Sequence, residues 1–220
     1  MNQFMELWIK EFEKKGIPSS FRQTPSNSVL WFEEFLKSQN LKPGKLLDLG
    51  AGKGRNAIHL TNNQFKVTCI DLIKENINYI TEKNIDAKVH DVTTPMPFSS
   101  ETFDYAIDVF CFKHLVDASA IHNYIEELKR VLKKGGIYHL SLASIDDGYY
   151  GPLLKNSPSP VQRLVVDPET KIPSILYYKK HIEELFKGFT LLEFFEKKNM
   201  GPMHGKLHVR CVLSFIFQYN

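Results

Sequence analysis

A glycine-rich segment of this chain has the residue types and spacing of a ligand-binding turn. It follows the short apolar run KLLDL (45–49), which carries Asp48 near its end, and it places glycines at positions 50, 52 and 54. Glycine lets a backbone turn tightly and approach a ligand where any Cβ atom would collide. The helical segment that follows would present free N–H groups, which suit a carboxylate or a phosphate. Alone, the turn also fits a loop without a ligand.

Two further aspartates follow the next apolar runs along the chain. Asp71 ends FKVTCID (65–71), and Asp91 ends DAKVHD (86–91). The carboxyl ends of parallel strands meet at one crevice, where ligands of open α/β sheets bind. There Asp71 could accept hydrogen bonds from both ribose hydroxyls of a nucleoside, and Asp91 could accept one from an adenine amino group. Each aspartate alone is also typical of a loop entry, but together with Asp48 they predict a nucleoside site.

The elements that position these residues alternate between strands and helices. Strands are expected at 45–49, 65–71, 86–91, 103–110 and 137–143, with helices through Asn62 and at 73–83 and 118–132. This rhythm is typical of parallel βαβ units with right-handed crossovers. After an expected helix at 179–187, the runs 189–198 and 206–217 predict a hairpin that adds an antiparallel strand at the sheet edge. The fold class is therefore α/β, a doubly wound, mostly parallel seven-stranded sheet with a C-terminal antiparallel hairpin.

The segments outside this alternation have their own patterns. Residues 3–15 predict an amphipathic helix that a Gly-Ile-Pro break at 16–18 ends, and Ser26 is the expected cap of a second helix through Ser38. Gly201-Pro202 is expected in the turn of the hairpin. The stretch 144–178 carries five prolines and is expected to be a long irregular loop. A loop of that length in a compact domain is usually functional.

Composition excludes several classes of protein. The chain has 220 residues, of which 43% are hydrophobic and 24% are charged, and a net charge of +3, an ordinary globular balance. The charge is too small to indicate nucleic-acid binding. The three cysteines lie far apart, so neither a disulfide framework nor a metal site is expected. Because no apolar run reaches transmembrane length and the N-terminus is unlike a signal peptide, we expect a cytoplasmic protein without a membrane partner. No oligomeric state is predicted.

The ordered motifs LDLGAGKGRN, CID, HDVTTPMPF, FDYAIDVF and LKRVLKKGGIYHLSL resemble those of class I S-adenosylmethionine-dependent methyltransferases. The resemblance covers residues 45–143 well and the hairpin in outline. GKGRNAIHL and the short C-terminal part are most similar to the small methyltransferases of the tellurite-resistance, TehB-like type. The resemblance implies S-adenosylmethionine as cofactor, S-adenosylhomocysteine as product, and one methyltransferase domain over residues 1–220. Its parts would be N-terminal helices in 1–40, a cofactor-binding core in 45–143, and a substrate-side loop with the hairpin in 144–220.

The resemblance also implies a set of cofactor-binding residues. Asp48 and the backbones of Gly50 and Gly52 would hold the methionine end, Asp71 the ribose, and Asp91 with Val92 the adenine. The Phe110 backbone would lie near the cofactor's amino group. The full expected set is Asp48, Gly50, Ala51, Gly52, Asp71, Leu72, Asp91, Val92 and Phe110. The aromatic stripe of Phe4 and Trp8 could make the first helix a lid over the cofactor, or could simply pack on the sheet.

The methyl acceptor is harder to read from the sequence. A sulfonium methyl group is already activated, so alignment and exclusion of water supply most of the catalysis, and a base is needed only for a protonated nucleophile. TehB-like proteins also have a histidine before their last strand, so His204 is our predicted catalytic residue. The end of the fourth strand, 111–114, offers further polar groups. The predicted substrate-side residues are Arg55, Tyr149, His208 and Arg210.

The predicted function is therefore methyl transfer from S-adenosylmethionine to a small molecule or a metalloid. One alternative is a nicotinamide-dependent oxidoreductase, which would share the glycine turn and Asp71. Its fingerprint ends in G-x-x-G, however, whereas the glycines here run G-x-G-x-G. Another alternative is a non-catalytic S-adenosylmethionine-binding protein, since catalysis by alignment leaves no compulsory side chain.

Overall fold

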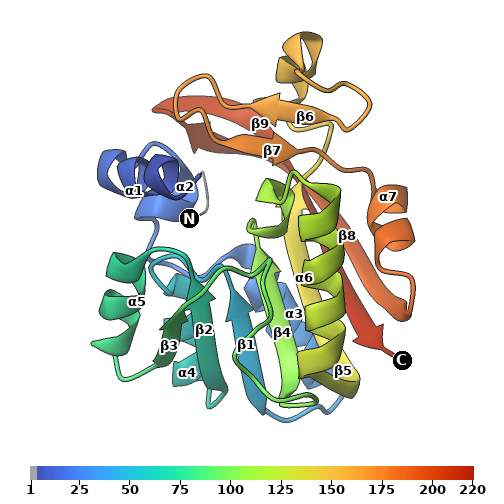
Figure 1. Ribbon diagram of the computed structural model, residues 1–220. Helices are drawn as coiled ribbons and strands as arrows, with labels where there is room; N and C mark the ends of the chain where they lie inside the picture. The colour runs from blue at the N-terminus through green and yellow to red at the C-terminus, as the bar shows by residue number, and fades with distance from the viewer. Residues whose placement is uncertain (1–3) are drawn as a thin grey trace.

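The structure, a computed structural model, describes residues 4–220, so Gln3, the expected start of the first helix, lies outside the described residues. Within them, seven strands form one sheet in the order β3-β2-β1-β4-β5-β9-β8 (Figure 1). The strands are β1 (Lys45–Leu49), β2 (Lys66–Asp71), β3 (Asp86–Val89), β4 (Phe103–Val109), β5 (Leu132–Ala143), β8 (Phe189–Met203) and β9 (Lys206–Tyr219). β1 to β5 are parallel, and β9 is antiparallel to both of its neighbours. The predicted fold class is confirmed, although β9 lies inside the sheet and β8 forms the edge.

Helices cover both faces of the sheet. α6 (Ala118–Val131) and α7 (Lys179–Leu185) lie on one face, and α3 (Asn27–Ser38) and α4 (Arg55–Asn62) on the other, where α5 (Lys74–Thr81) also packs (Figure 1). Successive side chains of a strand point to opposite faces. Leu46 accordingly joins the hydrophobic cluster of α3 to α5, whereas Leu47 joins the cluster of α6 and α7. Both faces are therefore buried, which explains the nearly continuous apolar runs of the strands.

A third group of elements covers the carboxyl ends of the parallel strands (Figure 1). It contains α1 (Met5–Lys14), α2 (Pro18–Phe21), and the two-stranded antiparallel sheet of β6 (Leu164–Val166) and β7 (Pro173–Ile175). A separate hydrophobic cluster holds these parts together and includes Ile17, Tyr150, Val165, Ile172 and Met203. This third group therefore covers the strand ends that carry the predicted ligand-binding residues.

The terminal hairpin also belongs to this third group. β5 ends at Ala143, opposite Val212, but the pairing of β8 with β9 continues to Met203 and Lys206. The hairpin therefore extends beyond the last strand of the parallel sheet. His204 and Gly205 form its turn with φ angles of 47° and 75°, the positive values that a two-residue hairpin turn of this twist needs. Gly201 and Pro202, expected in the turn, lie within β8 instead.

Four further expectations need correction. The stretch 144–178 is not irregular, because it contains the 3-10 helix Gly151–Asn156 and the strands β6 and β7. The two strands have only three residues each and are too short to give a periodic pattern. The break at 16–18 runs into α2, and β3 ends before Asp91. Ser26 precedes α3 as expected, but its hydroxyl bonds Ser28 Oγ at 2.9 Å rather than the helix backbone.

No helix within residues 4–220 combines the length and the apolar character needed to cross a membrane.

Candidate functional site

The glycine turn after β1 adopts a backbone that glycine alone accommodates at low cost. Gly50 and Gly52 have φ angles of 69° and 55°, which L side chains rarely adopt. A Cβ atom on Gly50 would also lie 2.5 Å from the side chain of Cys111. The N–H groups of Gly50 and Ala51 both donate to the Ile70 carbonyl, at 2.9 and 3.1 Å. The turn is thus held tightly between β2 and the segment after β4.

Asp71 links the end of β2 to this turn. Its Oδ2 accepts from the Gly52 N–H at 2.8 Å, and its Oδ1 accepts from the Ile73 N–H at 2.9 Å and from Asn76 at 3.3 Å. Burial raises the pKa of Asp71, whereas these hydrogen bonds act in the opposite direction. Asp71 therefore shapes the turn as well as facing the space beside it.

Asp48 is a buried carboxylate that lacks a full set of partners. It is 2% exposed, and its Oδ2 has no hydrogen-bond partner in the described part of the chain. Burial raises its pKa to about 8, and the neighbouring Asp108 and Asp71 add to the increase. A buried charge without a partner is costly. A cationic or hydrogen-donating ligand beside Asp48 would supply the missing partner.

These residues line the first of two adjoining cavities, which we call the glycine-turn cavity. Asp91, which accepts from the N–H and hydroxyl of Thr93 at 3.0 and 2.7 Å, lies on its wall with Val92. Phe4, directly before α1, and Trp8 and Phe12 of α1 complete the lining. The Phe12 ring lies so close to the turn that a Cβ atom on Gly52 would be 3.4 Å from it. The cavity therefore has an acidic floor of strand tips and an aromatic cover.

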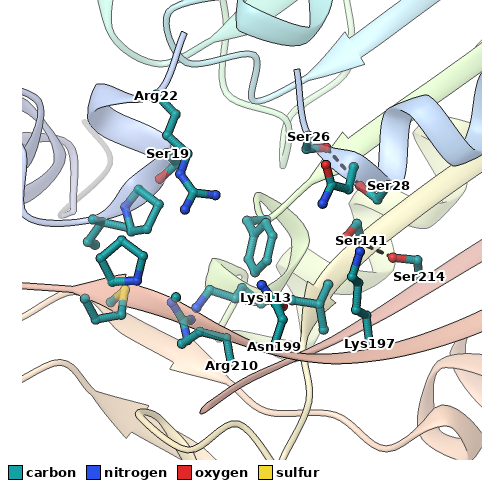
Figure 2. A pocket seen from close by; sticks show the side chains of 18 of the residues that line it. Ser19, Arg22, Ser26, Ser28, Lys113, Ser141, Lys197, Asn199, Arg210 and Ser214 are labelled. Atoms are coloured by element: carbon teal, nitrogen blue, oxygen red, sulfur yellow. Dashed lines mark hydrogen bonds between the residues drawn. The ribbon is translucent and has the colours of Figure 1, made fainter. Parts of the chain in front are cut away.

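The second cavity lies beside the first, between α2, the end of β4 and the extended hairpin. Five basic side chains line it: Arg22, Arg55, Lys113, Lys197 and Arg210. No acidic side chain among residues 4–220 lines it, so we call it the basic cavity. Figure 2 shows Arg22 reaching toward it from one side, with Lys113, Lys197 and Arg210 on the opposite side. Its apolar lining includes Trp8, Ile17, Phe195, Met203 and Val212.

Lys113 is the most unusual of these basic residues. It lies in the 3-10 helix Phe112–His114 directly after β4 and is only 2% exposed. Its Nζ atom has no hydrogen-bond partner within the described residues and lies 3.7 Å from the centroid of the Tyr150 ring. Burial lowers the pKa of Lys113 to about 7, and the nearby charge of Arg210 lowers it further in the same direction.

Arg210, in contrast, is fixed by a buried partner. Its Nε donates to Asp147 Oδ2 at 2.9 Å, and the Asp147 side chain is fully buried. Asp147 also accepts from the N–H groups of Tyr149, Tyr150 and Cys211. Because its two oxygens are engaged by four donors, Asp147 orients Arg210 toward the cavity and has little capacity left for Lys113.

Comparisons with known proteins show which proteins this chain resembles. Residues 46–136 match a family model described as a methyltransferase domain. The chain is 28% identical over 185 residues to the sterol 24-C-methyltransferase erg6 of Schizosaccharomyces pombe, covering 76% of this chain and 46% of that protein. It is 25% identical over 170 residues to the probable S-adenosyl-L-methionine-dependent methyltransferase TehB of Haemophilus influenzae, covering 74% and 51%. The chain is thus similar to a methyltransferase domain over residues 46–136 and to curated methyltransferases over about three quarters of its length.

Solved structures show the same fold. The 1,6-didemethyltoxoflavin-N1-methyltransferase of Burkholderia thailandensis, solved with 1,6-didemethyltoxoflavin and S-adenosylhomocysteine, superposes with a TM-score of 0.72 at 17% identity, covering 99% of this chain and 87% of that one. A S-adenosylmethionine-dependent methyltransferase of Methanosarcina mazei gives 0.71 at 21% identity, covering 84% and 96%. The chain spans about half the length of the curated relatives it matches.

The structure brings together every residue that the sequence predicts for cofactor binding. All of them line the glycine-turn cavity: Asp48, Gly50, Ala51, Gly52, Asp71, Leu72, Asp91, Val92 and Phe110. Their chemistry fits S-adenosylmethionine, whose sulfonium and ammonium groups are cationic. The unpartnered Oδ2 of Asp48 is an acceptor that such a cation can satisfy.

The residues predicted for the acceptor side are divided. Arg55 and Arg210 line the basic cavity, but Tyr149, His204 and His208 line neither cavity. The turn at 204–205 directs the His204 ring away from both: its Nε2 pairs with Asp167 at 2.9 Å, and its backbone N–H donates to the Gly16 carbonyl at 3.0 Å. His204 therefore connects the hairpin turn, the segment before α2 and the segment after β6.

Tyr149 and His208 lie beside this connection. The Tyr149 hydroxyl donates to Asp167 at 3.2 Å, and the rings of Tyr149 and His208 meet edge to face with centroids 5.0 Å apart.

The predicted substrate-side set omits most of the basic cavity. Arg22, Lys113 and Lys197 are absent from it, although Lys113 belongs to the segment 111–114 whose polar groups were noted. A signal for Lys113 does exist in the sequence, because VFCFKHLV (109–116) places one lysine inside an apolar run. Arg22 and Lys197 lie in ordinary polar surroundings and have no comparable signal.

Proposed function

We propose that this protein transfers the methyl group of S-adenosylmethionine, held in the glycine-turn cavity, to a small organic molecule held in the basic cavity. One observation carries the proposal: the two cavities share part of their walls. The shared residues are Trp8, Ser19, Arg22, Arg55, Phe110 and His114. An acceptor in the basic cavity would therefore lie directly beside a ligand in the glycine-turn cavity.

The cofactor supplies a methyl group that is already activated by its sulfonium. The chain has to bind the two reactants, orient them in line and exclude water, because proximity and orientation alone can supply about 7–11 kcal/mol of the barrier reduction. Asp48 and the turn at Gly50 and Gly52 would hold the methionine end, and Asp71 and Asp91 the nucleoside. Phe110 lies where the two cavities meet and would contact both reactants.

The first helix would help to exclude water. Trp8 lines both cavities and packs edge to face on His114 with ring centroids 4.8 Å apart, and Phe12 lies over the glycine turn. We therefore propose that α1 acts as a cover over the bound cofactor. Glu11 would keep the cover in place, because its carboxylate accepts hydrogen bonds from the Ile17 N–H and the Ser20 hydroxyl at 2.5 and 2.9 Å.

Catalysis in this arrangement does not depend on a strong side-chain base. His114 is the imidazole on the shared wall, and its Nδ1 is engaged with the Pro173 carbonyl at 2.8 Å. Burial lowers the pKa of His114 to about 3, and the charge of Lys113 contributes. His114 is therefore neutral near pH 7 and a weak base. We assign most of the rate acceleration to positioning, and we do not retain His204 as the catalytic group.

The names of the relatives support a small organic acceptor. They include a sterol methyltransferase, ajmaline N-methyltransferase of Rauvolfia serpentina and the toxoflavin enzyme. The apolar part of the basic cavity fits an organic body better than a bare metalloid oxyanion such as tellurite. Transfer to tellurite remains a useful arm of the test.

The proposal is tested by binding and by turnover. In a thermal-shift assay, S-adenosylhomocysteine should stabilise the protein and NAD should not. With S-adenosylmethionine labelled in its methyl group, label should pass to organic compounds in a small-molecule panel, and not to tellurite. Stabilisation by NAD alone would support the oxidoreductase alternative. Tight S-adenosylhomocysteine binding without transfer to any panel member would support a non-catalytic binding protein.

A further inference from the structure

The basic cavity concentrates positive charge in a way that the transfer reaction itself does not require. Five cationic side chains line it, contributed by the α2–α3 link, α4, the end of β4 and both strands of the hairpin. Segments that are distant in the sequence thus direct like charges into one space, although like charges in a partly dry cavity repel. A compensating anion is therefore expected among its ligands.

Two of these cations are free to bind a ligand. Lys113 Nζ is buried and has no hydrogen-bond partner among the residues that the structure describes. Arg210 uses Nε for Asp147, and its guanidinium makes no other hydrogen bond within residues 4–220. The remaining N–H groups of Arg210 are therefore available beside a lysine that lacks any acceptor. An Arg–Lys pair of this kind matches the oxygens of a carboxylate, phosphate or sulfate.

Neighbouring carboxylates leave Lys113 without a direct partner. Asp147 and Asp167 are the acidic groups that act on Lys113, but Asp147 is occupied by Arg210 and by three backbone N–H groups, and Asp167 by His204, Tyr149 and two backbone N–H groups. The contact of Lys113 on the other side is the face of the Tyr150 ring, which attracts a cation but accepts no conventional hydrogen bond. Lys197, on the hairpin, forms no ion pair in the described structure and adds a third positive charge to the wall.

The rest of the lining describes the body of the ligand. Trp8, Phe195 and Val212 offer aromatic and aliphatic surface, and Ser141 and Ser214 bond each other at 3.2 Å between β5 and β9. A bare inorganic ion would leave the apolar surface unused, and an amine would meet a wall of like charge. From these observations we infer that the methyl acceptor is an organic anion whose carboxylate or equivalent oxyanion binds Lys113 and Arg210. This inference rests on the proposed function, since it concerns the same cavity.

The test uses the full chain loaded with S-adenosylhomocysteine and ligands matched in shape but not in charge. Three sets serve: benzoate, benzamide and benzylamine; phenylacetate, phenylacetamide and phenethylamine; indole-3-acetate, indole-3-acetamide and tryptamine. Calorimetry should show that carboxylates bind about tenfold or more tightly than their amides, and that the amines do not bind. Lys113→Met should weaken carboxylate binding by about tenfold and narrow the preference for the carboxylate over the amide, and Lys197→Met, which removes a wall charge but no proposed contact, should weaken carboxylate binding by less.

Controls separate this inference from the proposed function. Lys180→Met removes one exposed charge from α7 and should leave carboxylate binding unchanged. The affinity of every variant for S-adenosylhomocysteine is measured first and should stay within about twofold of the parent. Failure of the parent to bind S-adenosylhomocysteine would refute the proposed function. With that binding intact, the inference is overturned if amides or amines bind as well as carboxylates, if no carboxylate binds, or if both variants keep the parent's carboxylate affinity.

Discussion

Replacing Lys113 by methionine should make this protein more stable. The lysine is 2% exposed and its ammonium group has no hydrogen-bond partner among the described residues, so the folded chain holds a charge that the unfolded chain exposes to water. Methionine has a similar length and is apolar, and it fills the same space. Removing a buried charge that lacks a partner relieves its desolvation cost. The variant should therefore unfold at a higher temperature than the parent.

The pKa of Lys113 gives the size of the expected stabilisation. Burial lowers it from an ordinary value of 10.5 to about 7, and each pKa unit corresponds to about 1.4 kcal/mol. At pH 7 the lysine therefore costs on the order of 4 kcal/mol of folding free energy. For a chain of this size one kcal/mol shifts Tm by about 2–4 °C, so the variant should melt roughly 10 °C above the parent.

The pH dependence of this difference tests its cause. Because the folded pKa of Lys113 lies below the unfolded one, the unfolded chain binds more protons between pH 7 and pH 10.5, and the parent gains stability as pH rises through that window. The variant lacks this gain. The difference in free energy of unfolding should therefore shrink to about 1 kcal/mol near pH 10, and the Tm difference should shrink with it. Other ionisable neighbours, such as Arg210 and Asp147, are present in both proteins and cancel in the comparison.

Calorimetric melting of the parent, Lys113→Met and Lys180→Met at pH 7 and pH 10 provides the measurement. Lys180 is 84% exposed on α7, so its replacement should change Tm little at either pH. A Lys113→Met protein that melts at or below the parent's temperature at pH 7 would refute the reasoning. So would a stabilisation of the same size at both pH values, because an apolar packing gain does not titrate.

Three further predictions concern the glycine-turn cavity. Asp71→Ala removes the acceptor of the Gly52 N–H and should weaken S-adenosylhomocysteine binding in calorimetry by about 1–3 kcal/mol; parental affinity would contradict the strand-end assignment. Gly50→Ala should abolish that binding and lower Tm. Gly135→Ala, also at positive φ but with open space around it, should lower the free energy of unfolding by only about 1 kcal/mol. Phe12→Ala should raise the Kd for S-adenosylhomocysteine several-fold at nearly unchanged Tm, and an unchanged Kd would exclude the cover role of α1.

The cofactor side of the site could be predicted from sequence because its geometry is local. Asp48 and Gly50 lie within one strand and the turn that follows it, Asp71 ends the next strand, and Asp91 follows the strand after that. Once the alternation of strands and helices indicates a parallel sheet, the carboxyl ends of those strands must meet. Short-range sequence and one topological rule thus place these residues together without knowledge of any side-chain contact.

The acceptor side depends on contacts that no short segment contains. Lys113 and Arg210 meet only because the hairpin extends beyond β5 and passes the end of β4. The sequence around His204 indicates a glycine-flanked turn, which is correct, but the direction of its ring depends on Asp167. That residue follows β6, a three-residue strand without a recognisable pattern. The turn at His204 is therefore predictable from the sequence, whereas the contact of its ring with Asp167 is not.

The charges of the two cavities bear on how both ligands are held. Aspartates form the floor of the glycine-turn cavity, and cations line the basic cavity, with Phe110 at their common wall. Phe110 has a φ of 72°, a strained value for a residue with a side chain, and its N–H donates to the Ser141 carbonyl at 2.8 Å. Acidic side chains on the other side of this wall would pair with Lys113 and Arg210 and remove the proposed anion site. The strain at Phe110 and the buried charge of Lys113 therefore both oppose stability beside the place where the two cavities meet and where the proposed reaction brings its two ligands together.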